Sequence, residues 1–465
     1  MKYGQQALRV LVLTGAFALS ALSPVRANTI WYVNKNSTGG TQNGLSWTNA
    51  FLTVYAAIAA ASPTVDAQGH SDEVWVAEGS YVPQASGGAS NGFTIIHPLG
   101  LYGGFKSGDT SISGRTGSYI LTILDGQFTT GSFAAHGVDI TGVPGASGNM
   151  GVVIDGFLIK HGHAAAAGVN GGGISSITSD ILLANLFVRD SSASNGAGLG
   201  GGLFFSSKNG SNYPTTGNIL HMKNCEFSNC DAAFGGGIYG DDLQGEIVNT
   251  RILTNTAGTG GGAVLNHMGS SNRLDFTNSV FWENIATSTP TGGGGLYLDS
   301  VGNAQLVNCT FNGNQAIGST GNVDGQALFV NTGSTATVYN TIFWGNSSSG
   351  KPLGGSGTLT MTYSDIEGWT GGGTGNIVLD PKFAFPGFGV LTLLSSSNCL
   401  DRADYSAVPL DDLDVDNDGI TNVVLPIDLG GNARLTDQTT VTDHGVGGHN
   451  CPLCQYLDMG AYERP

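Results

Sequence analysis

The sequence has little charge and little sign of helix. Only 11% of its 465 residues are Asp, Glu, Lys or Arg, against about a quarter in ordinary soluble domains. Soluble helices carry Lys and Glu on their outer faces, so this shortage indicates little helix surface. No hydrophobic periodicity of 3.6 residues runs through the central part of the chain. The sequence therefore argues against a mainly helical protein.

Positive charge is scarcer than negative charge. The chain has 17 Lys and Arg residues against 34 Asp and Glu residues, which gives a formal net charge of −17. A surface this negative repels nucleic acid and other polyanions. We therefore expect no nucleic-acid partner, and a polyanionic substrate would need bridging cations.

Long apolar runs are almost missing. One run, residues 10–22, follows Lys2 and Arg9 and precedes small or apolar residues at positions 25–27. This pattern is typical of a secretory signal peptide, here residues 1–27 with cleavage after Ala27. The run is too short to span a membrane comfortably, and no second run of spanning length follows. We therefore expect an exported protein, secreted or associated with the outer membrane, without a transmembrane segment after cleavage.

The chain has six cysteines. Cys451 and Cys454 form a C-P-L-C motif, close enough for a local disulfide. A zinc half-site is the alternative, but no second C-x-x-C motif completes it. Cys225 and Cys309 occupy equivalent repeat positions, which predicts small core residues. The sequence leaves the pairing of the remaining thiols undecided: Cys225, Cys230, Cys309 and Cys399.

Glycine is abundant, at 75 residues or about twice the usual frequency. It gathers in clusters followed by apolar residues, as in Gly235 to Tyr239. These clusters alternate with a second motif, N-x-x-[F/I]-x-x-N, and a degenerate earlier copy is centred on Phe187. The central residues of the main copies lie 25 to 32 positions apart: Phe227, Ile252, Phe281, Phe311 and Phe343.

This period predicts a parallel β-helix. Each repeat holds two or three short strand-like runs separated by Gly, Asn or Ser. Leucine-rich repeats need a regular Leu pattern, which is absent, and propeller blades are longer. A coil of short strands remains, each strand pairing in parallel with the same strand of the next coil. The Phe column is expected to stack in the core, and the Asn residues to make left-handed turns and ladders.

The two ends of the chain differ from the repeats. Residues 51–61 are the best helical stretch and are expected to cap the N-terminal end, because an exposed strand edge invites aggregation. Past residue 381 the repeat stops and an acidic stretch begins near Asp401. We therefore expect a signal peptide at 1–27, a capped β-helix at 28–385 and an irregular C-terminal region at 386–465.

Several segments carry a family resemblance. The opening TIWYVNKNSTGG and DEVWVAEGSYVP resemble bacterial β-helix proteins of the pectin-lyase-like superfamily, and the paired GGGI and FxxN elements resemble repeats of polymorphic outer-membrane proteins. The tail, with YSDIEGW, NIVLDPKF and DMGAYER, is similar to the choice-of-anchor Q domain. The resemblance implies an all-β, right-handed parallel β-helix exported to the cell surface or beyond. It implies no settled catalytic activity.

The acidic stretch holds the strongest metal-ligand pattern. Asp414, Asp416 and Asp418 alternate and are closed by Gly419, an arrangement that wraps oxygens around calcium. Leu425 stands where a loop of this kind usually has an acidic residue. Asp428 is the expected substitute, with Asp411 or Asp412 as alternatives. The sequence predicts a structural calcium site that pins the C-terminal region; a solvated acidic turn is the other interpretation.

Candidates for catalysis are weaker. Asp241 and Asp242 are adjacent carboxylates of the kind that glycosidases use, although a polar turn leaving a strand is the favoured interpretation. A polysaccharide lyase would need a basic residue near calcium-binding carboxylates. Its candidate bases form no readable cluster: Lys160, His161, Lys223 and Arg251.

Two tryptophans suggest contact with sugars. Trp282 and Trp344 each follow the inward Phe by one place, so strand alternation points both outward, where they could stack on a glycan. The alternative is that a long loop covers them. We therefore expect a non-enzymatic surface or secreted protein with an adhesion or glycan-contact role, for which the partner is a polysaccharide or a cell-surface glycan. The alternative is a carbohydrate-active enzyme, either a polysaccharide lyase or a glycoside hydrolase.

Overall fold

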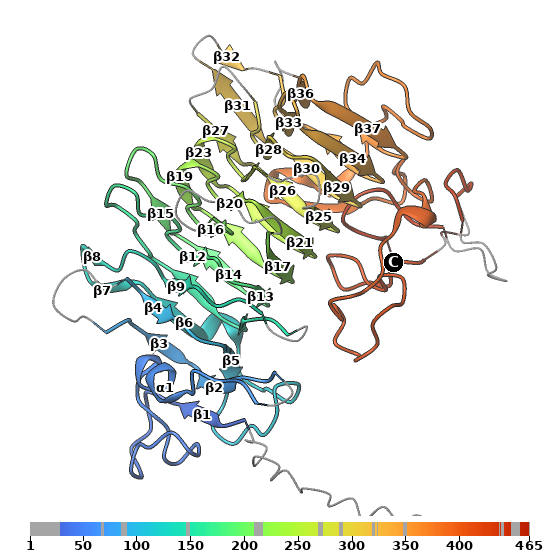
Figure 1. Ribbon diagram of the computed structural model, residues 1–465. Coiled ribbons are helices and arrows are strands. Elements are labelled where there is room, and N and C mark those ends of the chain that lie inside the picture. The colour runs from blue at the N-terminus through green and yellow to red at the C-terminus, as the bar shows by residue number, and fades with distance from the viewer. Residues whose placement is uncertain are drawn as a thin grey trace, which may run out of the picture.

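The protein is a right-handed parallel β-helix whose coils stack along one axis (Figure 1). The computed structural model describes residues 28–464 with gaps at 67–68, 85–90, 146–148, 209–216, 268–272, 288–291, 319–320, 323, 347–350, 437, 439–440 and 448–455. The expected signal peptide and the Cys451–Cys454 pair lie outside the described residues.

Each full coil runs through four strands that we assign to sheets A, B, D and C, in that order along the chain. In the described residues sheet A has eleven strands: β1 Ile30–Val33, β2 Asp72–Ala77, β5 Leu99–Phe105, β10 Val152–Asp155, β13 Ile181–Ala184, β17 Asn218–Lys223, β21 Leu243–Val248, β25 Leu274–Thr277, β29 Ala304–Val307, β34 Thr335–Tyr339 and β37 Thr358–Thr362.

Sheet B follows sheet A after a short turn. Its strands within the same described ranges are β3 Gly79–Tyr81, β6 Thr122–Asp125, β11 Leu158–Lys160, β14 Phe187–Arg189, β18 Glu226–Ser228, β22 Arg251–Leu253, β26 Val280–Trp282, β30 Thr310–Asn312, β35 Ile342–Trp344 and β38 Asp365–Ile366.

Sheet C closes each coil, and the short sheet D precedes it. Sheet C consists of β4 Phe93–Ile95, β9 Val138–Thr141, β12 Ile174–Ile177, β16 Leu203–Ser206, β20 Ile238–Asp241, β24 Ala263–Asn266, β28 Leu296–Asp299, β33 Leu328–Val330 and β36 Leu353–Gly355. Sheet D consists of β15 Ser192–Ala193, β19 Asp231–Phe234, β23 Thr256–Thr259, β27 Ile285–Ala286 and β31 Gln315–Gly318, with the antiparallel β32 Gly321–Asn322 at its end.

The two asparagines of the repeat motif have different roles. The first makes the turn from sheet A to sheet B with φ near +50°, a left-handed angle that Asn tolerates better than most residues; these are Asn185, Asn224, Asn249, Asn278, Asn308 and Asn340. The second forms a buried ladder between sheets B and D, in which each Nδ2 donates to the Oδ1 one coil further on. The ladder distances are 3.0, 2.9 and 2.9 Å along Asn255, Asn284, Asn314 and Asn346.

The expected core column is confirmed, with one shift of register. Phe227, Ile252, Phe281, Phe311 and Phe343 are fully buried, and the rings of Phe281 and Phe311 stack at 4.4 Å. In the earlier coil the inward residue is Val188, which pairs with Phe227, whereas Phe187 pairs with Glu226 on the outer face. The prediction that Phe187 is the core residue was wrong, because the turn of that coil begins at Asn185.

The glycine clusters make the sharp corner between sheets D and C. Gly235 has φ +65°, and a Cβ there would lie 2.3 Å from the carbonyl oxygen of Ile238. A side chain cannot be accommodated at that distance, so the corner requires glycine.

The N-terminal cap is a short helix, α1 Val54–Ala60, within the expected 51–61 stretch. Thr53 caps it by accepting a hydrogen bond from Ala56 N at 3.2 Å. Val54, Ala57 and Ile58 are buried, and the helix packs against β1, β2 and β4. Three further segments are short 3₁₀ turns: η1 Tyr119–Leu121, η2 Pro386–Phe388 and η3 Tyr405–Ala407. No helix in the described part of the chain is long and apolar enough to cross a membrane.

The C-terminal region follows the last coil strand, β38. It begins with the antiparallel hairpin β39 Phe383–Phe385 and β40 Val390–Leu393, and the expected boundary after residue 385 falls inside this hairpin. A second hairpin, β7 Gln127–Thr129 with β8 Ser132–Phe133, projects from an early coil. The C-terminal region has an apolar cluster of its own, which packs on outward residues of the coils such as Val248, Val280 and Ile342. In Figure 1 it lies as a red, largely irregular segment beside the coils.

The left-handed asparagines hold this region against the coils. Asn224 Nδ2 donates to the carbonyl of Val415, Asn278 Nδ2 to that of Ile427 at 2.9 Å, and Asn340 Nδ2 to that of Asp404 at 2.9 Å. The same column that makes the turns therefore also anchors the tail.

The four described cysteines are buried free thiols: Cys225, Cys230, Cys309 and Cys399. The expectation that Cys225 and Cys309 are small core residues is confirmed. Burial raises the pKa of both thiols to about 12, so they are unreactive.

Candidate functional site

The outer face of sheet A carries a row of polar side chains on successive coils. His221 pairs with Glu246, Glu246 with Asp275, and Asp275 with Gln305, each in register on the neighbouring strand. We call these four residues the axial column. Neighbouring strands lie about 4.8 Å apart, so the column brings two carboxylic acids and an imidazole close together.

The C-terminal region forms a wall beside this column. Lys223, on the same strand as His221, donates from Nζ to the carbonyls of Leu413 and Asp414 at 2.9 and 2.7 Å and to Asn417 Oδ1 at 3.1 Å. An ammonium group has three protons, and all three are used in these bonds. Lys223 therefore fixes the acidic loop, residues 411–419, over the edge of sheet A.

Glu246 has an unusual acidity. Burial raises the pKa of this carboxyl to about 7, and the negative charges of Asp412, Asp275 and Asp411 act in the same direction. A free glutamate is ionised at neutral pH. Glu246 is instead divided between its protonated and ionised forms there, as a proton donor requires.

Asp275, one coil away, is in a different environment. Arg273 Nε donates to its Oδ1 at 2.6 Å, and Arg273 Nη2 lies 2.6 Å from its Oδ2. Burial raises the pKa of Asp275, and the hydrogen bond and charge of Arg273 oppose that rise. Burial lowers the pKa of His221, against the opposing charges of Asp412 and Asp180. The column thus combines an acid that is partly protonated at neutral pH with an arginine-paired carboxyl group.

A cavity of about 820 Å³ lies on the same face of sheet A, nearer the N-terminus. It is lined by the aromatic rings of Trp75 and Tyr119 and by polar groups of both the coils and the acidic loop. Arg115 Nη2 lies 3.0 Å from Asp155 Oδ2, so the floor contains a buried ion pair. Aromatic rings beside fixed polar groups suit a sugar ring, which has apolar faces and a polar edge.

The predicted calcium loop is brought together in part. Carboxylate oxygens of Asp414, Asp416 and Asp418 lie within 4.8 Å of one another. Gly419 has φ +81° and its N–H donates to Asp414 Oδ1 at 3.1 Å, so the glycine makes the sharp turn. These oxygens suit a hard cation such as calcium.

Asp428 does not belong to that cluster. It is fully buried, and its carboxylate accepts hydrogen bonds from Asn432 N at 2.7 Å and from Glu463 N at 2.7 Å. It stabilises the 428–432 turn and ties it to the end of the chain. The prediction of Asp428 as a fourth ligand is therefore corrected.

The Asp241–Asp242 pair lies on sheet C, away from the axial column. Asp242 has the φ of +55° of a turn residue. Ser206 Oγ donates to Asp241 Oδ2 at 3.4 Å, and His267 Nδ1 lies 3.7 Å from Asp241 Oδ1. Burial raises the pKa of Asp241, and His267 opposes the rise. This geometry resembles a polar turn more than a pair of cooperating acids.

The two tryptophans do not form an open platform. Trp282 Nε1 donates to the carbonyl of Pro386 at 3.0 Å, and Gly389 lies against its ring. Trp282 and Trp344 are both half-buried against the apolar cluster of the C-terminal region. They point outward from the coils as expected, but the tail covers them.

The candidate lyase bases are engaged elsewhere and do not gather. Lys160 and His161 both contact Asp125, at 3.2 and 2.9 Å, and Arg251 Nη2 donates to the carbonyl of Leu429 at 3.3 Å. Lys223 is held by the acidic loop.

The sequence did contain a signal for the axial column. Each of its members stands three positions before the first Asn of its repeat, as His221 does before Asn224 and Glu246 before Asn249. Aligning the repeats on that Asn places the four side chains on one outward line. A search for chain-adjacent acids misses them, since they are about 30 residues apart.

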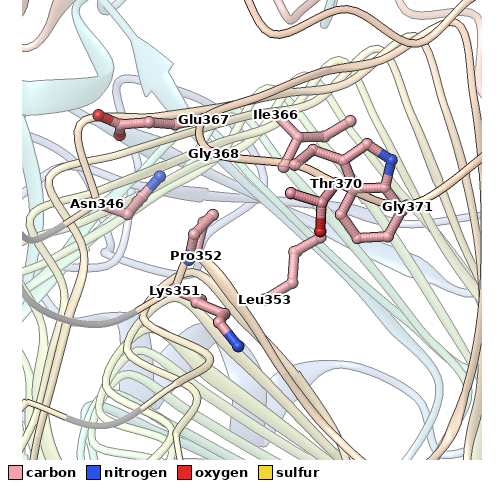
Figure 2. Close-up of a pocket in the computed structure, with 10 residues that line it drawn as sticks. Asn346, Lys351, Pro352, Leu353, Ile366, Glu367, Gly368, Thr370 and Gly371 are labelled. Atoms are coloured by element: carbon pink, nitrogen blue, oxygen red, sulfur yellow. The ribbon is translucent and has the colours of Figure 1, made fainter.

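A further cavity, of about 530 Å³, lies at the C-terminal end of the coils, where Asn346, the 351–353 segment and residues 366–371 enclose it (Figure 2). Glu367 accepts a hydrogen bond from Gly345 N at 2.8 Å. No second acid lines it among the described residues, so it lacks the paired chemistry of the axial column.

Comparisons with known proteins describe the fold alone. No protein-family model matches the sequence, and no curated protein matches it. The structure is similar to that of the pectate lyase Pel9A, at 14% identity over 95% of this chain and 98% of that one, with a TM-score of 0.47. It also matches a GH136 lacto-N-biosidase from Eubacterium ramulus (10% identity, 71% and 67% covered, TM-score 0.33) and a pectin methylesterase from Aspergillus niger (11%, 72% and 86%, TM-score 0.29). At these values the likeness carries no argument about activity.

Proposed function

We propose that the protein is an exported glycoside hydrolase that cleaves a neutral polysaccharide lying along the outer face of sheet A. The observation that carries this proposal is Glu246: a carboxyl with a pKa of about 7 that lies one strand away from the arginine-paired Asp275. Two carboxyl groups in environments that separate their acidities are the usual equipment for breaking a glycosidic bond.

The proposed reaction has two steps. Asp275 attacks the anomeric carbon, the glycosidic C–O bond breaks, and Glu246 gives its proton to the leaving oxygen. Water then attacks the glycosyl ester, Glu246 takes a proton from it, and Asp275 is released. Retaining enzymes hold their carboxyl groups about 5–5.5 Å apart, close to the spacing of neighbouring strands. We therefore propose retention of configuration.

The charge of the site favours a neutral substrate. The charges of Asp411 and Asp412 act on Glu246, and the whole chain carries a net charge of −17. A uronate polymer would be repelled. The bases that the sequence suggested for a lyase are already engaged: Lys223 is fully hydrogen-bonded to the acidic loop, and Lys160 and His161 contact Asp125. A purely adhesive role loses its support because the tail covers Trp282.

Calcium has a structural role in this proposal. Asp414, Asp416 and Asp418 would hold the ion, which would stiffen the acidic loop that borders both the axial column and the 820 Å³ cavity. Export by a signal peptide at 1–27, the division at 385/386, a Cys451–Cys454 disulfide and kinship with choice-of-anchor Q proteins of the pectin-lyase-like superfamily are part of the same proposal.

The test is release of reducing ends from neutral polysaccharides, such as xylan, β-glucan, galactan and mannan, with pectate and alginate in parallel. We expect wild-type activity on a neutral polymer, a loss of at least about 100-fold in Glu246→Gln and Asp275→Asn, and wild-type rates in Glu226→Gln. Glu226 is a half-buried outward carboxylate on sheet B and serves as the matched control. Activity only on pectate, or none in the wild type, would overturn the proposal.

A further inference from the structure

The cavity of about 820 Å³ on the outer face of sheet A has a fixed polar floor. Arg115 Nη2 donates to Asp155 Oδ2 at 3.0 Å, and Asn185 Nδ2 donates to Asp155 Oδ1 at 2.8 Å. The Arg115 side chain is only 7% exposed, and its guanidinium lies 5.0 Å from the centre of the Tyr119 ring. A ligand in this cavity therefore meets polar groups that are already held in position.

This floor leaves both donors and acceptors for a ligand. Three of the five N–H groups of Arg115 are used within the described residues: Nη2 donates to Asp155, and Nε and Nη1 donate to two backbone carbonyls at 2.8 and 3.0 Å. Asn185 Oδ1 and Glu73 Oε1 accept no hydrogen bond in the same part of the chain, where Glu73 Oε2 accepts one from Trp75 Nε1 at 2.7 Å. All these side chains line the cavity. A hydroxyl group both donates and accepts, so a polyhydroxylated ligand matches them.

The charge of the lining excludes an anionic ligand. Four carboxylates line the cavity against one guanidinium, and Asp155 already balances the charge of Arg115. Such a surface repels anions, and the calcium ion proposed for the acidic loop offsets two of the carboxylates, Asp414 and Asp418. Apolar surface between the polar groups comes from Ile30, Trp75, Ile112 and Tyr119. Polar groups beside apolar surface in a cavity of this size suit a short stretch of neutral sugar rings.

The cavity is aligned with the axial column. Glu73, in its lining, belongs to the same outward line of side chains as Glu246. Between them, the line passes through Gly100, Val153, Leu182 and His221. Five strand spacings, about 24 Å, separate Glu73 from Glu246. Val153 and Leu182 are half-buried, so apolar surface connects the cavity to the column.

We propose that the cavity binds a segment of a neutral polysaccharide about five sugar units from the point where the same chain passes Glu246. One hexose unit advances a polysaccharide by roughly one strand spacing, ~5 Å. A chain of about six units therefore reaches both places, whereas a trimer reaches one of them. That this chain is the substrate of Glu246 rests on the proposed hydrolysis; its binding in the cavity does not.

Ser113 offers a substitution that fills the cavity from its rim. It is exposed and lies in the 110–115 segment that lines the cavity. Ser113→Trp should therefore occupy the space without disturbing the core, and Ser113→Ala leaves it open. Ser396→Trp, at an exposed serine of the C-terminal region, is the matched control for the added ring.

The test is isothermal titration of the Glu246→Gln protein, so that hydrolysis does not consume the probe, in a calcium-containing buffer. The neutral probes are cellohexaose, xylohexaose and mannohexaose with their trimers, and the charged probes are the hexamers of galacturonate and of glucosamine. We expect one neutral hexamer or more to bind, and its trimer to bind at least about 10-fold more weakly. Added to this background, Ser113→Trp should weaken hexamer binding by at least about 10-fold, whereas Ser113→Ala and Ser396→Trp should stay within about 3-fold of it.

A second variant tests the floor of the cavity. Asn185 has φ +51°, so Asn185→Gly keeps the left-handed turn and removes the free acceptor. It should weaken hexamer binding by about 5-fold, and it serves if Ser113→Trp does not fold.

Four results would overturn the inference: no heat with any neutral hexamer, unchanged binding in both Ser113→Trp and Asn185→Gly, equal affinities for a hexamer and its trimer, or a charged hexamer that binds more tightly than every neutral one. Binding that depends on the cavity, in a protein that cleaves no polysaccharide, would retain the cavity site and refute the hydrolase. Cleavage with binding unchanged in the cavity variants would do the reverse.

Discussion

Lys223 Nζ donates a 2.7 Å hydrogen bond to the carbonyl oxygen of Asp414, a residue 191 positions further along the chain. The lysine is almost completely buried, and burial lowers the pKa of its ammonium group while the charge of Asp414 opposes that shift. This contact joins strand β17 of sheet A to the loop that borders the axial column. The site thus depends on a bond between the repeats and the tail.

Replacing Lys223 should loosen the acidic loop and leave the coils intact. In Lys223→Met two backbone carbonyls and Asn417 lose a charged donor, which costs about 2–3 kcal/mol. We expect faster proteolysis within residues 411–419 and a lower unfolding midpoint, with unchanged far-ultraviolet circular dichroism. The control is Lys351→Met, which removes the ion pair between an exposed lysine and Asp324. It should change neither the proteolysis of residues 411–419 nor the unfolding midpoint, since exposed ion pairs contribute little to stability.

Breaking the asparagine ladder should destabilise the coils themselves. Asn284 Oδ1 accepts from the Asn255 side chain, and its Nδ2 donates to the Ile252 carbonyl and to Asn314. Asn284→Ala leaves several buried groups without partners, so we expect a loss of about 3 kcal/mol in urea unfolding. Asn331 is half-buried, donates to Asp299 and accepts from the exposed N–H of Thr332, and water can replace both bonds, so Asn331→Ala should cost less than about 1 kcal/mol. Equal losses in the two variants would contradict the role of the ladder.

Hydrolysis should decline on the alkaline side at about pH 7. Glu246 must be protonated to act as the acid, and its pKa of about 7 means that the active form disappears as the pH rises through that value. Asp275 must be ionised, so activity also falls under acidic conditions. The measurement is the pH profile of kcat on a neutral polysaccharide. An alkaline limb that stays in place when Asp412 is replaced by Asn would contradict the assignment, since the Asp412 charge helps to raise the pKa of Glu246.

Two buried carboxyls, Asp365 on the last coil strand β38 and Asp458 in the C-terminal region, should make stability depend on pH. Burial raises the pKa of Asp365 and of Asp458 to about 7, above the value of about 3.9 in an unfolded chain. Their contribution is fully present below about pH 4 and is lost as the pH rises through about 7. Asp365→Asn should therefore gain stability relative to wild type between pH 5 and pH 8 in denaturant unfolding. A constant difference over that range would contradict the raised pKa.

Calcium should stiffen the acidic loop. Isothermal titration of the wild-type protein should show binding that disappears in Asp416→Ala plus Asp418→Ala. Asp428→Asn should keep the binding, because Asp428 lies in a separate turn. Identical heats in the wild type and the double variant would show that Asp416 and Asp418 do not bind calcium.

The repeat part of the fold could be read from the sequence because each coil repeats its own constraints. Asn at the turn, Phe in the core and Gly at the corner recur at a nearly fixed spacing, so the sequence alone placed Phe281, Phe311 and Phe343 correctly in one stacked column. Phe187 was misplaced because a neighbouring apolar residue, Val188, could fill the same position. The core residues were therefore predicted correctly where the repeat motif is well formed, and incorrectly where it is degenerate.

The site could not be read in the same way, since it depends on contacts that carry no local pattern. The pKa of Glu246 is raised by its burial and by the charges of Asp412, from the C-terminal region, and of Asp275, one strand away. The sequence predicted an exposed Trp282, because no residue of its own repeat indicates that Pro386 and Gly389 pack against its ring. The environment of Glu246 and the covering of Trp282 both depend on how the irregular C-terminal region packs on the coils. The repeat pattern of the sequence contains no information about that packing.

The C-terminal region also limits the number of coils that the β-helix can have. It is anchored to Asn224 through Val415 and to Asn340 through Asp404, at the two ends of a stretch of consecutive coils. Duplicating one coil between these anchors would shift them by about 4.8 Å relative to each other, more than a hydrogen bond tolerates. A repeat protein can ordinarily lengthen by copying its unit. In this chain the C-terminal region is bound to both Asn224 and Asn340, so it fixes the number of coils between them.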